Sequence, residues 1–344
     1  TIDLDKLQNS TESFHKAQFS VHSQQQYIHF VTPPLYLSGP ELELSGMHVK
    51  TSYKIYSSGT VSVRITLNMQ GEWVQCVKHT TALRQDDQLE ILARQQLDKV
   101  LSDISFAMTK PCKPLMEDYY LFHIVPDNES PSALDMLDDY SDAIAQMIVG
   151  DEQKLSKQEQ KDILKTYFSY YENDFTIVHW DSAFIYDTKH GASPIEDLLE
   201  FANTQMVELR NLDDLLDTEL DYLYHHIDDH KWFSWLHTGQ GATKRAERLR
   251  LILVDVRELA DQSTNALKIT GDAFYSRLYK GACQRFGLPD WQKQIETKFD
   301  SVHQIYRFII DEAHHSRGNF LEITIVILIA VEILLALFEL SRHH

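Results

Sequence analysis

Alternation of hydrophobic and polar residues marks the first half of the chain after a polar, Gln- and Ser-rich lead-in at 1–30. Leu42–Tyr56 and Thr60–Asn68 alternate on either side of Ser57-Ser58-Gly59. Val61, Val63 and Ile65 fall on one face of the second segment, while Arg64 falls on the other. Because side chains alternate across a strand, this pattern predicts a hairpin with one buried face. We expect further strands at Trp73–His79, Tyr119–Val125, Phe175–Trp180 and Ala183–Tyr186.

Helical spacing of apolar residues appears between these strands. It predicts helices at Asp86–Met108, Ser132–Val149 and Ser156–Tyr170. Ser156 and Glu159 have the spacing of a capping box, which supports the start of the last helix. Residues 31–190 are therefore expected to form a mixed α/β domain.

After Pro194 the β pattern disappears and helical spacing continues. Pro194–Asp229 and Ala242–Phe286 are expected to be helices, separated by the stretch KWFSWLHTGQG. From Ile295 the apolar positions step by four and then three, through Phe299, Val302, Tyr306, Ile309 and Ala313. This is the spacing of a coiled coil. We expect residues 191–319 to form a helical stalk.

The strongest apolar segment is Leu321–Leu340, LEITIVILIAVEILLALFEL. A helix rises about 1.5 Å per residue, so roughly 20 residues cross a hydrocarbon layer of about 30 Å. We expect residues 320–341 to form a single transmembrane helix that anchors the chain at its C-terminal end. The alternative is a buried core helix or an oligomer seam. The predicted fold class is α+β: an N-terminal α/β domain, then long helices, then one membrane helix.

Charge narrows the range of partners. The formal net charge of −19 over 344 residues opposes nucleic-acid binding. A protein that binds the acidic domain is a possible partner. Glu196–Asp229 holds eleven acids against one base, Arg210, and is interpreted as a solvated or salt-bridged face. The basic run Lys244–Arg257 is expected to lie against it. The three cysteines form no CxxC pair, which indicates neither a zinc cluster nor a disulfide framework.

Four residues of the apolar segment are candidates for a membrane or oligomer role. Glu332 is a carboxylate within the hydrocarbon, where an unpaired charge costs several kcal/mol. Glu339 and Ala336 share its helical face, and Glu322 marks the other end of the segment. Glu332 either faces a ring of copies or is protonated and hydrogen-bonds a neighbouring helix. His314, His315 and Arg317 mark the membrane boundary.

The sequence YHHIDDH contains the candidate metal ligands. His226 and His230 are four residues apart, as are His225 and Asp229, so each pair shares a helical face. Imidazole and carboxylate suit a divalent metal such as zinc. The alternative is a polar helix end, and no cofactor is otherwise indicated. No phosphate-binding loop, GxGxxG or GxSxG motif is present, so the sequence assigns no enzyme activity.

The C-terminal run resembles that of the required-for-meiotic-nuclear-division family, in which Leu-Glu, bulky aliphatics and a second Glu recur. The matching positions here are Leu321, Glu322 and Glu332. The resemblance implies an inner-membrane, homo-oligomeric protein, in mitochondria one that supports organellar translation. The layout is also similar in outline to that of CorA-type magnesium channels. The second membrane helix and Gly-Met-Asn signature of those channels are missing.

We therefore expect a tail-anchored, homo-oligomeric membrane scaffold or regulatory protein with a large cytosolic or matrix domain. We place it in a bacterial inner membrane, or alternatively in the mitochondrial inner membrane. A second hypothesis is a ligand-gated, ion-conducting or membrane-perturbing oligomer of CorA-like layout. A third is a membrane-tethered, metal-dependent enzyme that uses the histidine cluster.

Overall fold

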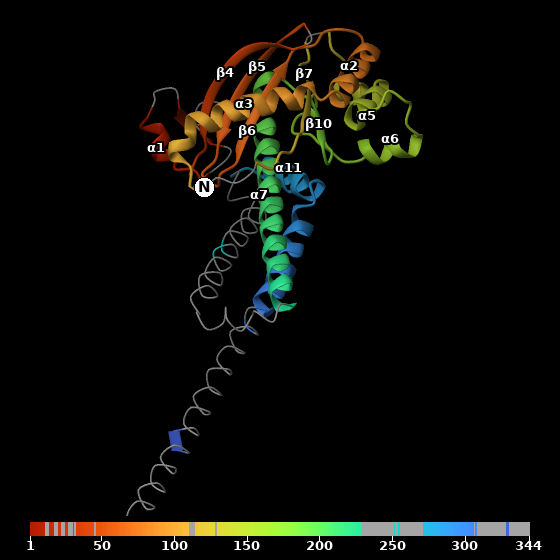
Figure 1. Cartoon of the computed structure of the whole chain (residues 1–344). Coiled ribbons are helices and arrows are strands. Elements are labelled where there is room, and N and C mark those ends of the chain that lie inside the picture. The colour runs from red at the N-terminus through yellow and green to blue at the C-terminus, as the bar shows by residue number, and fades with distance from the viewer. Residues whose placement is uncertain are drawn as a thin grey trace, which may run out of the picture. The chain divides into compact units, whose positions relative to one another are not determined.

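The structure, a computed structural model, is mixed α+β, with sheets in its N-terminal half and helices later (Figure 1). It describes residues 1–10, 14–16, 20–21, 25–26, 30, 32–44, 46–109, 114–127, 129–228, 251, 254, 271–305, 307 and 328–329. Two compact units are present. The first is Thr1–Asn211 with Leu259–Trp291, and the second is Leu212–Glu258 with Gln292–His344.

The first sheet has the order β1-β4-β5-β6 and is antiparallel throughout. Its strands are β1 (His15–Lys16), β4 (Leu35–Leu44), β5 (Met47–Ile55) and β6 (Val61–Leu67). The hairpin around Ser57-Ser58-Gly59 is thus confirmed, although Gly46 divides the expected first strand in two. A short β2 (Ser20–Val21) and β3 (Gln25–Gln26) pair separately.

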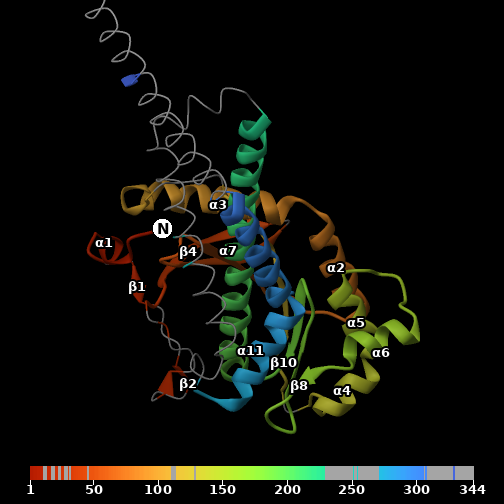
Figure 2. The same cartoon turned by 90° about the horizontal axis from the view of Figure 1, so that it is seen from below.

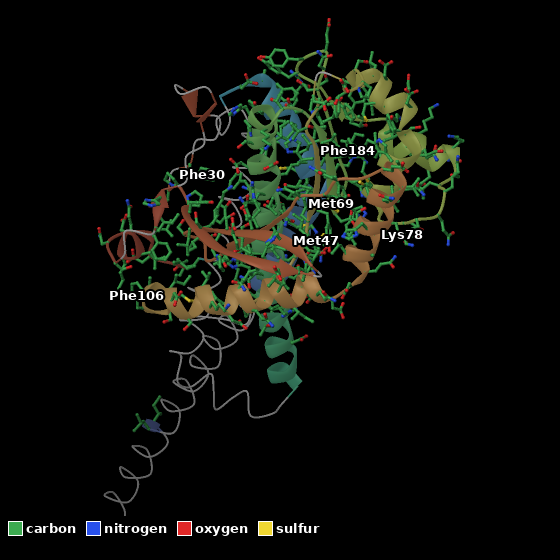
Figure 3. The ribbon with its side chains drawn as sticks, turned by 90° about the horizontal axis from the view of Figure 1, so that it is seen from above. Phe30, Met47, Met69, Lys78, Phe106 and Phe184 are labelled. Atoms are coloured by element: carbon green, nitrogen blue, oxygen red, sulfur yellow. The ribbon has the colours of Figure 1, made fainter. Side chains whose placement is uncertain are left out.

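Apolar residues on one face of this sheet pack against α1 (Leu4–Gln8) and α3 (Gln88–Ile104). Helix α3 runs across the strands in Figure 1 and lies beside them in Figure 2. The buried cluster joins residues of the strands, both helices and the following turn: Ile2, Leu4, Leu7, Leu35, Tyr53, Ile55, Val100, Ile104 and Ala107. Phe106, in the 3₁₀ turn Ser105–Ala107, lies at the end of α3 (Figure 3). The expected loose lead-in is therefore wrong for the first eight residues, because three of them complete this core.

The second sheet has the order β7-β10-β9-β8. β7 (Tyr120–Ile124) is parallel to β10 (Ser182–Tyr186), and β9 (Phe175–Val178) and β8 (Tyr167–Phe168) are antiparallel to their neighbours. One face packs on a helical layer made of α2 (Trp73–Gln85), α4 (Ala133–Asp139), α5 (Ser141–Val149) and α6 (Lys157–Leu164). Phe184 lies within this core (Figure 3).

Three expectations about this region need correction. Trp73–His79 is the start of helix α2 rather than a strand, because Trp73, Val77 and Thr81 follow helical spacing toward the core, while Val74 is exposed. The expected helix Ser132–Val149 is broken at Tyr140 into α4 and α5. The helix after Ser156 ends at Leu164 and gives way to β8. Its cap is confirmed, since the Glu159 amide donates to Ser156 Oγ at 3.1 Å.

Helix α7 (Lys189–Asp228) is the long helix expected after Pro194, with the proline inside its first two turns. Within the first unit it packs on α11 (Ala273–Arg285), where the Phe201 and Tyr279 rings stack at 5.9 Å. Tyr279 also donates to Gln205 Oε1. The second unit contains the remainder of α7.

In the second unit, the helix at 288–305 continues beyond Trp291 and carries the first three positions of the expected coiled-coil pattern. Ile295, Phe299 and Val302 are buried, as predicted. Lys298 Nζ lies 2.6 Å from Asp213 Oδ1 and 2.7 Å from Asp217 Oδ1, which ties this helix to the second half of α7. Tyr306, Ile309 and Ala313 lie outside the described residues.

No helix among the described residues has both the length and the apolar character that crossing a membrane requires. Of the predicted anchor, only Leu328 and Ile329 are described. Both are helical, with 60% and 50% of their surface exposed.

Candidate ligand-binding site on the first sheet

The face of the first sheet opposite α3 is polar and carries two bases, one buried and one half-buried. Lys54 on β5 lies opposite Tyr36 and Ser62, and Arg64 on β6 lies opposite Ser52. The alternation that directs Val63 toward the α3 side therefore directs Arg64 and Lys54 to this side. Lys54 is only 7% exposed.

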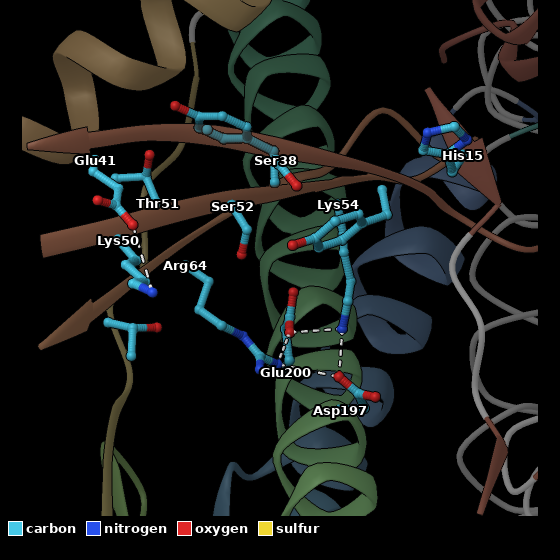
Figure 4. Close-up of a pocket in the computed structure, with 14 residues that line it drawn as sticks. His15, Ser38, Glu41, Lys50, Thr51, Ser52, Lys54, Arg64, Asp197 and Glu200 are labelled. Carbon is cyan, nitrogen blue, oxygen red and sulfur yellow. Dashed lines mark hydrogen bonds and ion pairs between the residues drawn. The ribbon is translucent and has the colours of Figure 1, made fainter. Parts of the chain in front are cut away.

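The first half of α7 covers this polar face with carboxylates. Glu200 lies four residues after Glu196 and three after Asp197, so each of these acids is a neighbour of Glu200 on the surface of the helix. Lys54 Nζ lies 2.6 Å from Asp197 Oδ1 and 2.9 Å from Glu200 Oε2 (Figure 4). Arg64 donates to Glu196 Oε2 at 3.0 Å, to Asp197 Oδ1 at 3.2 Å and to Glu200 Oε2. We call these five side chains the charge network.

Pairing overcomes the cost of burial in this network. Burial alone would raise the pKa of Glu200, but the nearby charges of Lys54 and Arg64 lower it to about 2. Burial likewise opposes ionisation of Glu196, yet a hydrogen bond from His123 and the charge of Arg64 lower its pKa. The same carboxylates raise the pKa of Arg64 against its own burial. Glu196, Glu200 and Arg64 are therefore all shifted toward their charged forms.

His123 connects the second sheet to this network. Its Nε2 lies 2.9 Å from the backbone oxygen of Asp187, and its Nδ1 lies 3.4 Å from Glu196 Oε1. Burial would lower the pKa of His123, but these two acceptors outweigh burial and raise the pKa above its ordinary value. When protonated, the ring donates to both acceptors.

A cavity of about 710 Å³ lies between the polar face of the strands and α7 (Figure 4). Six charged side chains line it: Glu41, Lys50, Lys54, Arg64, Asp197 and Glu200. Hydroxyl groups line it as well, from residues that include Ser38, Ser52 and Thr66. A pocket of this size and polarity suits a small polar molecule.

The β-bulge between Ser38 and Glu41 shapes one wall of the cavity. Gly39 sits in this bulge, and a Cβ atom there would lie 2.2 Å from Thr51 Oγ1 and 2.8 Å from Tyr53 Cε2. The Thr51 hydroxyl instead donates to the Pro40 carbonyl at 2.7 Å. Glycine is therefore required for the close approach of β4 and β5.

A second polar cluster surrounds Asp181. Arg84 donates to the carbonyls of Met147 and Ile148 at the end of α5, and to Asp181. His179 Nδ1 lies 3.0 Å from Asp181 Oδ1. Burial opposes ionisation of Asp181, but His179 and Arg84 lower its pKa. Because Asp181 is held between His179 and Arg84 and Arg84 caps a helix, this cluster serves the fold.

Most residues singled out in the sequence lie outside the described part of the chain. These are Glu322, Glu332, Ala336, Glu339, His314, His315, Arg317, Asp229 and His230. The backbone of His225 and His226 belongs to α7, but their side chains are not described. Within the described residues, no group of three or more His, Cys, Asp or Glu side chains could hold a metal ion.

The charge network was not identified from sequence, although its signals were present. The acidic run of α7 is salt-bridged, as one of the two interpretations held. Its described basic partners, however, are Lys54, Arg64, His123 and Lys298. The basic run expected to face it lies outside the described residues, apart from Leu251 and Val254. The sequence did contain a signal for Lys54 and Arg64, because both bases lie at polar positions of alternating strands.

Comparison with known proteins places the N-terminal half in a family. The sequence model of the family described as "Uncharacterized protein MJ0711, N-terminal domain" matches residues 1–193. This range includes both bases of the charge network and ends just before its acids. The uncharacterized protein MJ0711 of Methanocaldococcus jannaschii is 28% identical over 180 residues, which is 52% of this chain and 54% of that protein.

The chain thus spans about half the length of this curated relative. No solved structure matches the chain. The match to the family covers more than half of the chain and includes the whole first sheet and nearly all of the α/β part. The chain therefore belongs to the family of the MJ0711 N-terminal domain.

Proposed function

We propose that this protein is a membrane-anchored, homo-oligomeric scaffold whose acidic α/β body lies beside a membrane. The proposal depends on the segment Leu321–Leu340, which is long and apolar enough for one bilayer crossing. Leu328 and Ile329 support it, because half or more of each side chain is left uncovered by the protein. Lipid is the solvent that would favour such exposure.

We propose that copies of the chain associate through the anchor helix, and not through the part of the stalk at 295–302. Ile295, Phe299 and Val302 are already buried within one chain. Glu332, by contrast, is costly in hydrocarbon unless it is protonated or a second helix supplies a hydrogen-bond partner. The resemblance of Leu321, Glu322 and Glu332 to the required-for-meiotic-nuclear-division family also supports an oligomer in an inner membrane.

Membrane fractionation of the full chain tests the anchor. The double variant Leu328→Arg/Ile329→Arg places two charges in the proposed hydrocarbon, at about 2.5–3.5 kcal/mol each on insertion scales. The matched control is Leu251→Arg/Val254→Arg, at helical positions with 62% and 54% exposure. We expect the wild type and the control to resist alkaline extraction from membranes, and the anchor variant to be released. Release of the wild type would refute the anchor.

A second candidate is a ligand-gated conducting oligomer, and the cavity against α7 is the observation that favours it. The two candidates differ in the role of Glu332. A scaffold with Glu332→Gln should still assemble and pass no ions, because a neutral amide can maintain a hydrogen bond between helices. A conducting ring should lose cation flux or its pH response in liposomes.

A further inference from the structure

We propose that the cavity between β4–β6 and α7 is a binding site for a small, uncharged polyhydroxy compound, such as a sugar or a related polyol. This inference concerns the α/β body and is independent of membrane anchoring.

The charge network, at the inner wall of the cavity, disfavours ligands with a net charge. Lys50, Lys54 and Arg64 balance three carboxylates in the lining. Lys54 and Arg64 are committed to buried or half-buried carboxylates. At the charge network, an anion would have to displace Asp197 or Glu200, and a cation would have to displace Lys54 or Arg64. Either exchange leaves a buried charge without its partner, which is strongly unfavourable.

Three hydroxyl groups in the lining have hydrogen-bonding capacity to spare. Ser38 and Ser52 are opposite each other on β4 and β5, and Thr66 lies on β6. Among the described residues, none of these hydroxyls has a hydrogen-bond partner. They form a polar surface beside the charge network. When a ligand fills the cavity and covers one of these hydroxyls, the ligand or a water molecule must supply its hydrogen-bond partner.

A hydroxyl-rich ligand meets the needs of both kinds of group. A carboxylate only accepts hydrogen bonds, and an ammonium or guanidinium group only donates them. A ligand hydroxyl does both, so it can donate to a network carboxylate and accept from a network base without breaking the charge balance. Tyr36 belongs to the same lining, and an aromatic ring supplies the apolar surface on which a sugar ring can pack.

Isothermal titration of the full-length, detergent-solubilised protein tests this inference. The probes are neutral one- to three-ring sugars and straight-chain polyols, with inorganic pyrophosphate and spermidine as charged comparators. Saturable binding of at least one neutral probe, and of neither charged comparator, is expected.

Two variants test the location of binding. Ser52→Val removes a lining hydroxyl and adds bulk, and we expect it to weaken binding at least tenfold. Glu41→Gln should weaken binding, while Glu43→Gln, a matched exposed carboxylate on the same strand but outside the lining, should not. The thermal unfolding midpoint of Ser52→Val verifies that the variant is folded.

Several outcomes would overturn the inference. Binding of pyrophosphate or spermidine with the same sensitivity to Ser52→Val would assign the cavity to a charged ligand. Binding of a sugar that a folded Ser52→Val leaves unchanged would place the site elsewhere. Failure of every neutral probe to bind would refute the polyol class.

Discussion

Lys54 is the more deeply buried of the two bases that join α7 to the first sheet. Its ammonium group is nearly buried and contacts two carboxylates at 2.6 and 2.9 Å. A buried ion pair adds little net stability relative to a well-packed apolar pair, because both charges lose water. Removing Lys54 is different, since Arg64 then remains as the only base in contact with both Asp197 and Glu200, and two nearly buried carboxylates share a single positive charge.

Lys54→Ala is therefore expected to lower the free energy of unfolding by about 3–5 kcal/mol. Lys50→Ala is the control on the same strand. Lys50 pairs with Glu41 at 3.5 Å, but both side chains are about 70% exposed, so the loss should be below about 1 kcal/mol. Urea denaturation of the two variants measures the difference. Equal effects of the two substitutions would contradict the importance of the buried pair.

His123 should make stability depend on pH near neutrality. Its pKa is raised in the folded protein above the ordinary 6.5, so the folded state holds its proton more tightly than the unfolded state. The resulting stabilisation is fully present below pH 6.5 and is lost as the pH rises through the folded pKa. His123→Gln should remove this component of the pH dependence.

The measurement is the free energy of unfolding of the wild type and of His123→Gln, each determined between pH 5 and pH 9. The exposed His190, at the start of α7, provides the control. His190→Gln should retain the wild-type slope. A wild type and a His123→Gln variant with parallel curves would show that the His123 contacts contribute nothing through protonation.

At the scale of elements, sequence patterns identified the hairpin, α3, α7 and the β9–β10 pair, because each has a long or clear periodicity. They failed at Trp73–His79, where seven residues fit both a strand and the first turns of a helix. Alternation also separated the two faces of β6 correctly. It could not show that α7 covers the polar face, because Lys54 and Asp197 are 143 residues apart.

The bulge in β4 allows a test of how closely the strands approach. Gly39→Ala should lower the free energy of unfolding by about 1–3 kcal/mol, because its Cβ would collide with Thr51 and Tyr53. Glu43→Ala, exposed on the same strand, should change it by no more than about 0.5 kcal/mol. Thermal or urea unfolding provides the measurement. A neutral Gly39→Ala would show that the bulge relaxes freely.

At the scale of the whole molecule, α7 is one continuous helix that contributes to both compact units. Its residues up to Asn211 belong to the first unit and those from Leu212 to the second. Its carboxylates form ion pairs in each unit. They pair with Lys54 and Arg64 in the first unit and with Lys298 in the second. The sequence predicted its length and acidity, but not the division of its acids between two sets of bases.

The mass of the detergent-solubilised full-length complex, measured by light scattering with the detergent subtracted, tests the proposed membrane oligomer most directly. We predict a fixed multiple of the chain mass that persists on dilution, because Glu332 gains a partner only when helices associate. The Leu251→Arg/Val254→Arg variant should give the same multiple. A wild-type protein that stays in aqueous buffer without detergent and has the mass of one chain would contradict the proposal.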